Sequence, residues 1–373
     1  MSTQLGARVL IASVFDWWST YRAVQILGRA GAQVETLGDP TLTFTRSRFV
    51  SRAIAASRQP AEIAATLEAQ LERERYDWVI VADDVLFTYL GSLPNPWWVR
   101  PWFPVAPGSR AFAFATSKLA FPQICRDAGL PVPEFALART LEHALDAARS
   151  FGYPVIGKTA FGFAGRAVTR LENARALQAW WQGLQPPAIV QRFIVGRYAT
   201  TEMLFDRGKP RAYFSSIRSN FWPTPLGTSA TRTLANPPGI DRIVELLGTV
   251  TEMDGFCNIC WIWGDDGVPY LSEFNPRPTP GYLLHPTIRD MLVAAVRDRF
   301  AAAPHNVRTI TELSQTIQQF PEHFAFAATN GGFRRWCEAF ASIGNAPLDE
   351  PALALAQARA AIKLGREMRR RPP

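Results

Sequence analysis

The residues Leu-Ser-Glu-Phe-Asn-Pro-Arg occupy positions 271–277 and include the end of a strand predicted over Pro269–Phe274. Side chains of a strand alternate between its two faces, so Glu273 and Asn275 share one face. Two oxygen donors on one face suit Mg²⁺, which takes few protein ligands and completes its shell with water and phosphate oxygens. Arg277 extends the row and offers a planar fork to a phosphoryl or carboxyl group. A solvent-facing edge strand would give the same spacing, and this segment alone leaves that alternative open.

A second segment, Gly152–Lys158, reads Gly-Tyr-Pro-Val-Ile-Gly-Lys. It predicts a short buried strand, Tyr153–Lys158, that ends in a lysine, and Gly162 and Gly165 follow in a turn. Such a turn can fold the backbone over a phosphate that the lysine contacts. The turn is not a Walker motif, which requires GxxxxGK[ST].

A third segment, Thr116-Ser117-Lys118, begins a helix predicted over Ser117–Ala128, and Gly129-Leu-Pro-Val-Pro133 ends it. Lys118 therefore lies near a helix N-terminus, where the backbone favours anions. Taken alone, it would be an ordinary surface lysine.

In this order and spacing, the three segments resemble the ATP-grasp superfamily over roughly residues 105–285. Within that superfamily they are similar to carboxylate–amine ligases and to the ATP-binding domain of carbamoyl-phosphate synthase. The pattern has an early lysine before G-(I/L)-P-x-P, a G-x-P-x-x-x-K strand, a hinge strand and a final E-x-N-P-R. The last string is intact at Glu273–Arg277.

The resemblance implies a site for ATP with Mg²⁺, with Mn²⁺ as an alternative metal. Lys118 and Lys158 match the phosphate-contacting lysines, and the flap at Gly162 and Gly165 would cover the triphosphate. The remaining implied contacts are Gln191, Phe193 and Ile194 in the hinge strand for adenine, Glu202 for the ribose, Glu273 and Asn275 for the metal, and Arg277, Arg218 and Arg232 for the transferred group.

Some of these assignments have open alternatives. Relatives often carry the ribose-binding acid nearer the hinge, around Tyr198, than Glu202. Arg218 and Arg232 flank a predicted loop, Asn220–Ala230, and the sequence does not decide which of them meets the phosphate.

Cys260 is a departure from the superfamily pattern, because it stands where relatives usually have an acid or a glutamine. The sequence leaves open whether one or two metals bind: either Glu273 and Asn275 hold both metals with water, or a residue such as Glu252 contributes. Cys257 and Cys260 also spell CxxC, but no second pair or close histidine pair completes a zinc site. We expect two structural thiols on opposite faces of a strand.

The fold class expected is mixed α/β and α+β in three parts. Residues 1–108 predict a parallel-sheet α/β domain, because three apolar strands (Arg8–Ser13, Gln33–Leu37, Asp77–Ala82) alternate with helices at Thr20–Ala30 and Pro60–Arg75. Asp16, Asp83 and Asp84 follow strands at the edge where such folds bind ligands. Residues 109–300 predict a two-lobed ATP-grasp module, and residues 301–373 a helical C-terminal segment.

Composition supports a globular protein, with 47% hydrophobic and 19% charged residues. Four cysteines in 373 residues suggest free thiols, and with no membrane-length apolar run or signal peptide we expect a cytoplasmic protein. The net charge of +8 comes without a nucleic-acid motif. Small-molecule substrates are therefore expected rather than nucleic acid or membrane, and a homodimer is left open.

The expected activity is ligation of a carboxylate to an amine, or to a thiol, through an acyl phosphate, with release of ADP and phosphate. One alternative is an ATP-grasp carboxylase or kinase that acts on another acceptor. The other is a nucleotide-binding protein without catalysis. Neither the carboxylate nor the amine can be named from the sequence.

Overall fold

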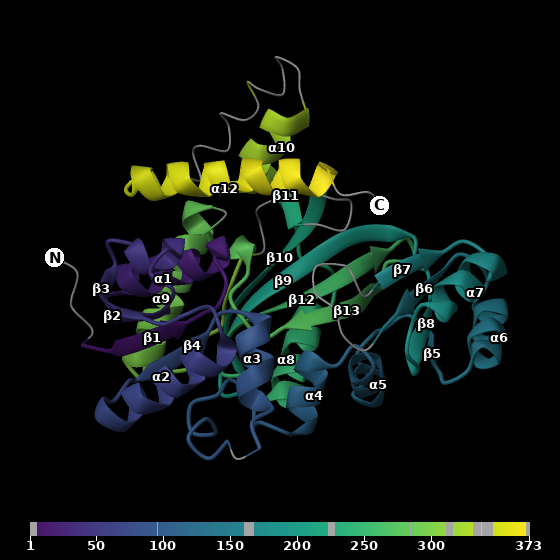
Figure 1. The fold of residues 1–373 in the computed structure, drawn as a ribbon, viewed down its shortest axis with the longest axis horizontal. Coiled ribbons are helices and arrows are strands. Elements are labelled where there is room, and N and C mark those ends of the chain that lie inside the picture. The colour runs from purple at the N-terminus through teal and green to yellow at the C-terminus, as the bar shows by residue number, and fades with distance from the viewer. Residues whose placement is uncertain are drawn as a thin grey trace. The chain divides into compact units, whose positions relative to one another are not determined.

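The computed structural model describes residues 6–94, 96–159, 168–222, 228–283, 285–310, 316–330, 337 and 346–370. The chain divides into two compact units, and Figure 1 labels their elements. Unit 1 comprises Met1–Phe112, Thr201–Asn258 and Asn275–Pro373, whereas unit 2 comprises Ala113–Thr200 and Ile259–Phe274.

The first sheet is parallel, lies in unit 1 and has the strand order β3-β2-β1-β4. The elements of this region are β1 (Arg8–Ala12), α1 (Trp18–Ala30), β2 (Gln33–Gly38), the 3-10 helix η1 (Thr43–Arg46), β3 (Val50–Ala55), α2 (Pro60–Arg73), β4 (Trp78–Val81) and α3 (Asp84–Gly91). The predicted strands and helices are confirmed, with ends that differ by one or two residues. Strand β3 was missed because most of its side chains are exposed and it lacks an apolar run.

Local sequence explains where the helices of this sheet begin and end. Helix α1 ends where Gly31 adopts a φ of 96°, a left-handed conformation that glycine tolerates at a helix C-terminus. Helix α2 begins at Pro60, which has the φ of a first helical turn and needs no N–H partner there. Apolar side chains of α1, β1, β2 and β4 form one core with α9 (Pro286–Phe300).

The largest sheet has the order β13-β12-β9-β10-β11-β15, and β14 pairs with β10. Its elements and the adjoining helices are β9 (Gly196–Asp206), β10 (Lys209–Trp222), β11 (Thr228–Leu234), α8 (Ile240–Thr251), β12 (Gly255–Gly264), β13 (Pro269–Asn275), the 3-10 helix η2 (Pro280–Leu283), β14 (Arg308–Thr309) and β15 (Thr316–Gln318). Strands β9, β12 and β13 each begin in one unit and end in the other.

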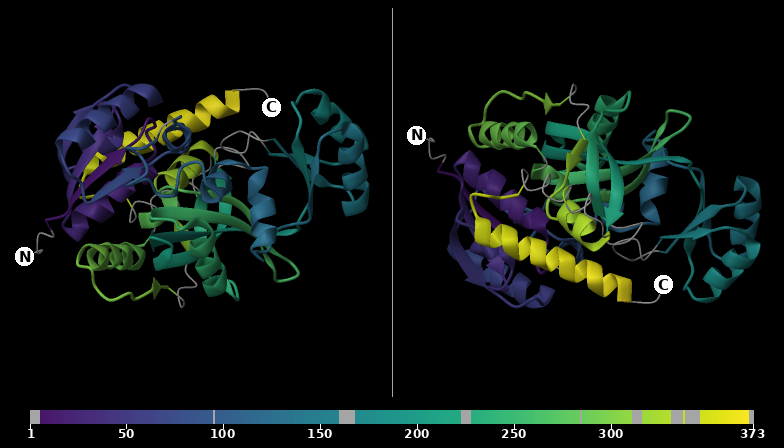
Figure 2. Two further views of the ribbon diagram at one scale, coloured as in Figure 1. Left: turned by 90° about the horizontal axis from the view of Figure 1, so that it is seen from below. Right: turned by 90° about the horizontal axis from the view of Figure 1, so that it is seen from above.

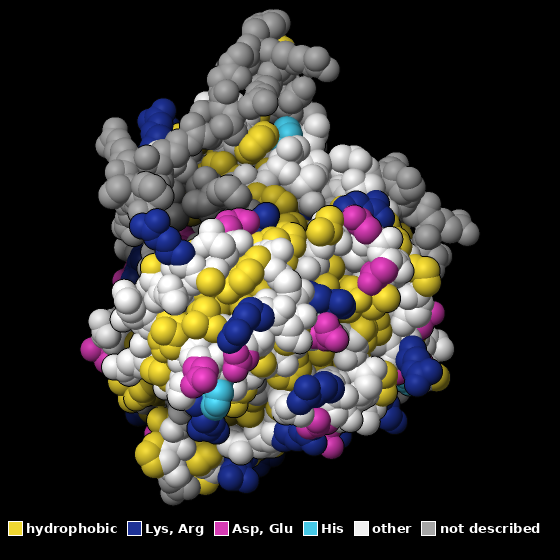
Figure 3. Space-filling view, turned by 90° about the vertical axis from the view of Figure 1, so that its right-hand side faces the viewer, with side chains coloured by type: hydrophobic (Ala, Val, Ile, Leu, Met, Phe, Trp, Pro, Cys, Tyr) yellow, Lys and Arg dark blue, Asp and Glu magenta, His cyan; other side chains and the backbone are white. Residues whose placement is uncertain are grey.

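The third sheet lies in unit 2 and has the order β5-β8-β6-β7. Its region comprises α4 (Arg110–Thr116), α5 (Ala120–Asp127), β5 (Phe135–Ala138), α6 (Leu141–Phe151), β6 (Val155–Lys158), β7 (Val168–Leu171), α7 (Ala174–Gln182) and β8 (Ala188–Arg192). Helices α6 and α7 pack on the sheet through a small apolar core. Figure 3 views the molecule from the side of these helices, and basic and acidic side chains are interspersed on the face shown.

The C-terminal residues are mainly helical, as predicted, with the two short strands β14 and β15 added. They form α10 (Glu322–Asn330) and α12 (Pro351–Arg370). Helix α12 contacts α10 and η1. Figure 2 shows α12, in yellow, from two sides. Gly365 lets α12 approach Trp222 closely, because a Cβ there would lie 2.9 Å from the indole ring.

The predicted fold class is confirmed, because a parallel α/β sheet is followed by sheets with antiparallel pairing. Across the described residues, no helix is both long enough and apolar enough to cross a membrane.

Candidate active site

Two predicted phosphate-binding lysines converge on one strand in unit 2. Lys118 lies in the turn between α4 and α5, and its ammonium donates a hydrogen bond to Oε1 of Glu273 on β13. Lys158, the last residue of β6, donates to the carbonyl oxygen of Ser272 at 3.4 Å. The structure therefore brings together residues that lie in three separate segments of the sequence.

Lys158 has an unusual electrostatic environment. The residue is only 8% exposed, and burial lowers the pKa of its ammonium from 10.5 to about 8. The positive charge of Lys118 lowers the pKa further, while Glu273 and Cys125 oppose the shift. The ammonium groups of Lys118 and Lys158 thus outnumber the single carboxylate of Glu273, and a bound anion would stabilise the site.

Close packing fixes the strand that carries Lys158. A Cβ on the preceding residue, Gly157, would lie 2.7 Å from the ring of Trp180 on α7. Only glycine allows the strand and the indole to approach so closely. The lysine therefore projects from a rigid strand rather than from a loop.

The predicted hinge residues lie at the end of β8. Gln191 is buried, and it pairs with Phe135 of β5 on one side and Ile156 of β6 on the other. Phe193 and Ile194 follow the strand and are half-buried, and the guanidinium of Arg170 lies 4.5 Å from the Phe193 ring centroid. Because β5 and β6 pair with β8 on both sides at Gln191, the backbone groups that could bind adenine are better sought just beyond the end of the strand.

A second group of predicted residues lies in unit 1. Asn275 donates from Nδ2 to Oδ1 of Asn258 at 3.1 Å, and its own Oδ1 accepts from Arg277 at 3.3 Å. Arg277 also forms an ion pair of 2.7 Å with Asp84, the first residue of α3. The Asn275 amide and the Arg277 guanidinium, which were expected on one face of the strand, are thus in contact.

Arg218 and Arg232 do not flank a loop of the predicted length. Strand β10 continues to Trp222 and β11 begins at Thr228, so the predicted loop Asn220–Ala230 is wrong at both ends. The two arginines are direct cross-strand partners in the ladder.

Arg232 and Glu202 form a buried ion pair. Their side chains are 4% and 0% exposed, and the two charges lie 3.0 Å apart. Arg232 also donates to Gln319 at 2.8 Å and to Ser216 at 3.1 Å. Gly281 closes over the carboxylate, because a Cβ there would lie 2.4 Å from its Oε1. Glu202 therefore lies in a buried network, and its role toward a ribose stays a prediction.

The remaining predicted residues are placed as follows. Gly162 and Gly165 lie outside the described residues. Tyr198 is 41% exposed on β9, and Glu252 is exposed where it ends α8. Cys260 is half-buried and Cys257 fully buried, and neither forms a disulfide bond.

Asp84 and Trp17 were not predicted as site residues. Asp84 had been noted only as one of the polar residues that follow a strand, and its contact with Arg277 gives it a closer connection to the site. The guanidinium of Arg277 lies over the indole of Trp17, 6.0 Å from the centroid of that ring. Its position directly after the first strand and Asp16 was the available signal.

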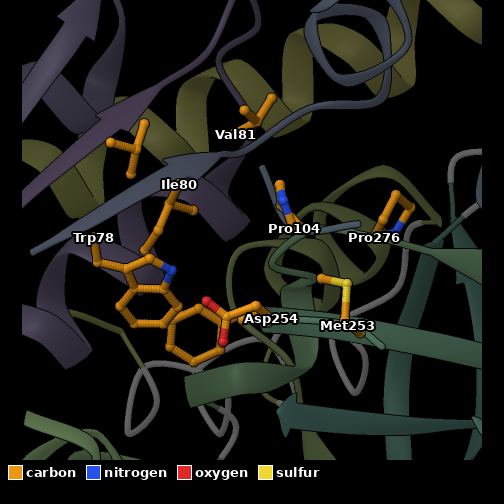
Figure 4. Close-up of a pocket in the computed structure, with 10 residues that line it drawn as sticks. Trp78, Ile80, Val81, Pro104, Met253, Asp254 and Pro276 are labelled. Carbon is orange, nitrogen blue, oxygen red and sulfur yellow. The ribbon is translucent and has the colours of Figure 1, made fainter. Parts of the chain in front are cut away.

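A small pocket lies elsewhere in unit 1, between β4 and the start of β12 (Figure 4). Trp78, Pro104, Met253, Asp254 and Pro276 are among its lining residues. None of the residues lining this pocket was predicted to bind a ligand. In the described part of the chain, no cluster of three or more His, Cys, Asp or Glu side chains has the arrangement of a metal site.

No protein-family model matches the chain. The carbamoyl phosphate synthase large chain of Mycobacterium sp. (strain JLS) is 27% identical over 190 residues, which cover 46% of this chain and 16% of that protein. The match thus covers less than a fifth of the relative's length.

Solved structures match over most of the chain. N5-carboxyaminoimidazole synthetase from Staphylococcus aureus superposes with a TM-score of 0.64 at 15% identity, covering 84% of this chain and 82% of that one. L-amino acid ligase from Bacillus licheniformis gives a TM-score of 0.59 at 14% identity, covering 79% and 74%. At such identities the likeness establishes the shared fold.

Proposed function

We propose that this chain, which has the ATP-grasp fold, is an ATP-dependent ligase that joins a carboxylate to an amine through an acyl phosphate. The fold expected from the sequence is confirmed, because the relative and the structural neighbours described above are all ATP-grasp enzymes. We place the ATP-grasp module at residues 109–300, between an N-terminal domain (1–108) and a helical segment (301–373). The activity is the proposal developed here.

The observation that carries the proposal is the convergence of Lys118 and Lys158 on β13. The strand presents the Glu273 carboxylate to one ammonium and the Ser272 carbonyl to the other. A lysine whose pKa is lowered to about 8 by burial gains from a bound polyanion, because phosphate oxygens restore the missing negative charge. ATP supplies such an anion and a transferable phosphoryl group.

The metal expected with ATP fits the donors that are present. Glu273 offers a carboxylate that is 45% exposed, and Asn275, two residues on, offers an amide oxygen. Mg²⁺ prefers such oxygen ligands and keeps water in the rest of its shell. Bound there, it would neutralise phosphate charge; Mn²⁺ suits the same donors.

In the proposed reaction, a substrate carboxylate attacks the γ-phosphorus and ADP leaves. Lys118 and Lys158 hold phosphate oxygens, and Arg277 orients the carboxylate through its planar fork. Arg218 and Arg232 are proposed to support the transferred group, and Glu202 the ribose. An amine then attacks the acyl carbon and phosphate leaves, so no covalent enzyme nucleophile is required.

The first test is ATP-dependent trapping. The protein is incubated with candidate acids, MgATP and hydroxylamine, and hydroxamate and ADP are measured together. Lys158→Ala and Glu273→Gln are each expected to lower turnover at least about a hundredfold, because the first loses a contact with the transferring phosphate and the second weakens the metal that would neutralise its charge. Glu72→Gln, an exposed change on α2, should leave turnover unchanged.

Two outcomes would contradict the proposal. Release of AMP and pyrophosphate would mean an adenylate intermediate instead of an acyl phosphate. Tight MgATP binding without turnover of any acid would favour the nucleotide-binding protein that the sequence left as an alternative.

Bicarbonate is a second candidate for the acid. The name of the S. aureus neighbour denotes a carboxylated amine, and such a product requires a one-carbon acid. ADP release stimulated by bicarbonate alone, and insensitive to other acids, would favour this carboxylase alternative.

We also propose a cytoplasmic setting and small-molecule substrates, with no nucleic-acid or membrane partner. The four cysteines, two of them fully buried, form no disulfide bond, which supports a reducing compartment. Sedimentation at several protein concentrations tests for a homodimer.

A further inference from the structure

Four side chains gather at the carboxyl edge of the parallel sheet in unit 1. Phe15 and Trp17 follow β1, Asp84 follows β4, and Arg277 reaches them from beyond β13. The carboxyl edge is where open parallel sheets bind ligands.

The buried side chain of Asp83 connects the residues that follow β1 to the start of α3. It accepts hydrogen bonds from the Ser13 hydroxyl at 2.9 Å and the Val14 amide at 2.8 Å, both directly after β1. Its other oxygen accepts from the Leu86 amide at 2.8 Å, which caps α3. Asp84 and the segment that carries Phe15 and Trp17 are therefore held in one arrangement.

The charged half of this group consists of Asp84 and Arg277. Their side chains are 22% and 15% exposed, so the ion pair is sheltered but open to solvent on one side. The carboxylate and the guanidinium lie 2.7 Å apart. Opposite charges at this separation match a molecule whose own ammonium and carboxylate are one carbon apart.

The apolar half consists of Phe15 and Trp17. Their rings form an edge-to-face pair with centroids 6.0 Å apart, and the residues are 42% and 37% exposed. Large aromatic side chains left in solvent beside a charged pair are typical of a recognition surface rather than of a core.

We propose that these four residues bind the acid substrate, and that this substrate is an α-amino acid with an aromatic or large aliphatic side chain. The inference rests on the ligase function proposed above. Arg277 binds the substrate carboxylate, Asp84 binds its α-ammonium, and Phe15 and Trp17 contact its side chain.

The arrangement decides which amino acid supplies the carboxyl group. An ammonium paired with Asp84 stays protonated and has no free electron pair, so it cannot attack an acyl phosphate. The carboxylate oxygen forms its bond to the γ-phosphorus, the bond from that phosphorus to the ADP oxygen breaks, and ADP leaves. The amine of a second molecule then forms the C–N bond, phosphate leaves, and solvent takes the proton. The residue bound at Asp84 becomes the N-terminal part of the product.

The test compares three compounds in the hydroxamate assay: L-phenylalanine, 3-phenylpropionate, which lacks the ammonium, and L-alanine, which lacks the large side chain. L-Phenylalanine is expected to have a kcat/KM at least about tenfold above either, since a charged hydrogen bond and a buried ring each contribute this much. Hydroxylamine supplies the nitrogen, so a second substrate is not needed.

Two variants separate the contacts. Asp84→Asn should raise the KM for L-phenylalanine at least about tenfold and leave 3-phenylpropionate within about twofold of wild type. Trp17→Ala should lower the preference for L-phenylalanine over L-alanine. Glu72→Gln on α2 is the matched loss of one carboxylate, and it should change neither ratio.

Nucleotide binding is measured in parallel by the MgATP-dependent shift in melting temperature. A normal MgATP shift with equal use of L-phenylalanine and 3-phenylpropionate would overturn this inference alone. Absence of the MgATP shift in wild type would instead overturn the proposed function. Equal losses of both acids in Asp84→Asn would show that Asp84 only positions Arg277.

Discussion

Lys118 donates a hydrogen bond to Glu273, which lies 155 positions later in the sequence. The side chains are 19% and 45% exposed, so solvent screens the pair in part. The carboxylate expected to bind metal therefore already has a cation beside it. Phosphate and metal together would provide new partners for both residues.

Lys118→Met should change metal binding and nucleotide binding in opposite directions. Without nucleotide, Mn²⁺ should bind Glu273 up to about fivefold more tightly, because a competing ion pair worth about 1 kcal/mol is removed. ATP should bind at least about tenfold more weakly, since a charge-assisted hydrogen bond is lost. Electron paramagnetic resonance of free Mn²⁺ and calorimetry with ATP measure the two effects.

The matched control is Lys363→Met, which removes an exposed lysine that pairs with Glu367 on α12. It should alter neither affinity. If Lys118→Met weakened Mn²⁺ as well as ATP, the lysine would support the metal site instead of competing for it.

Binding of MgATP should take up a proton near pH 8.5. With a pKa of about 8, most Lys158 side chains are neutral at that pH in the free protein. A neighbouring phosphate favours the charged ammonium and raises this pKa. Calorimetry in two buffers of different ionisation enthalpy should show uptake that falls toward zero by about pH 6, where the lysine is already protonated. Lys158→Met should abolish the uptake.

Lys158→Met should also make the ligand-free protein more stable at pH 7. The native pKa of about 8 lies below the ordinary 10.5, so the unfolded chain binds more protons between these values and stability rises with pH across that window. Below pH 8 the full penalty of the buried charge is present, about 3 kcal/mol. Urea unfolding of the variant should lack this pH dependence. A less stable variant would mean that the lysine already has adequate partners.

Glu350→Gln should destabilise the junction between the N-terminal sheet and α12. This buried carboxylate accepts from the Tyr21 hydroxyl at 2.6 Å, Gln25 at 3.1 Å, the Ser47 hydroxyl at 3.2 Å and the Arg48 amide at 2.7 Å. An amide in its place turns two hydrogens toward these donors. We expect a loss of about 3 kcal/mol in the free energy of unfolding.

The neighbouring Asp349 provides a control for that loss, because its side chain is 27% exposed and pairs with Arg29 and Arg48. Asp349→Asn should cost less than about 1 kcal/mol. Equal losses in the two variants would remove the special role of Glu350.

The cysteines should react with a thiol reagent according to their burial. Cys337 is exposed and should react within minutes, whereas Cys125 and Cys257 are buried and burial raises the pKa of both thiols. These two should react only after unfolding. Elemental analysis should find no stoichiometric zinc, and zinc lost on replacing Cys257 and Cys260 together would contradict their structural role.

Elements with strong periodic patterns or clear end signals could be predicted from the sequence. Helix α6 spans Leu141–Phe151 because Thr140 caps its first turn and Gly152 ends it, and both signals are legible in the sequence. Helix α12 follows Pro351 in the same way. The strand β11 was missed since its polar residues lie in a sheet whose burial depends on the distant segment β15.

The residues of the site could be predicted, but their contacts could not. Lys118, Lys158 and Glu273 could be proposed from motifs because the motifs are local. The ion pair between Arg277 and Asp84 joins a residue just beyond β13 to the first residue of α3, and no spacing encodes it. The burial of Glu202 beneath Gly281 is likewise a tertiary effect, which periodicity along β9 does not reveal.

The strands β9, β12 and β13 each belong partly to both units, and this limits how the protein can be cut. A recombinant fragment of Ala113–Thr200 would lack Ile259–Phe274, which carries Glu273 and the carbonyl that Lys158 contacts. A designer of domain swaps must therefore exchange both stretches at once, with all three strand crossings preserved. Evolution by recombination faces the same constraint, so these units are expected to be inherited together.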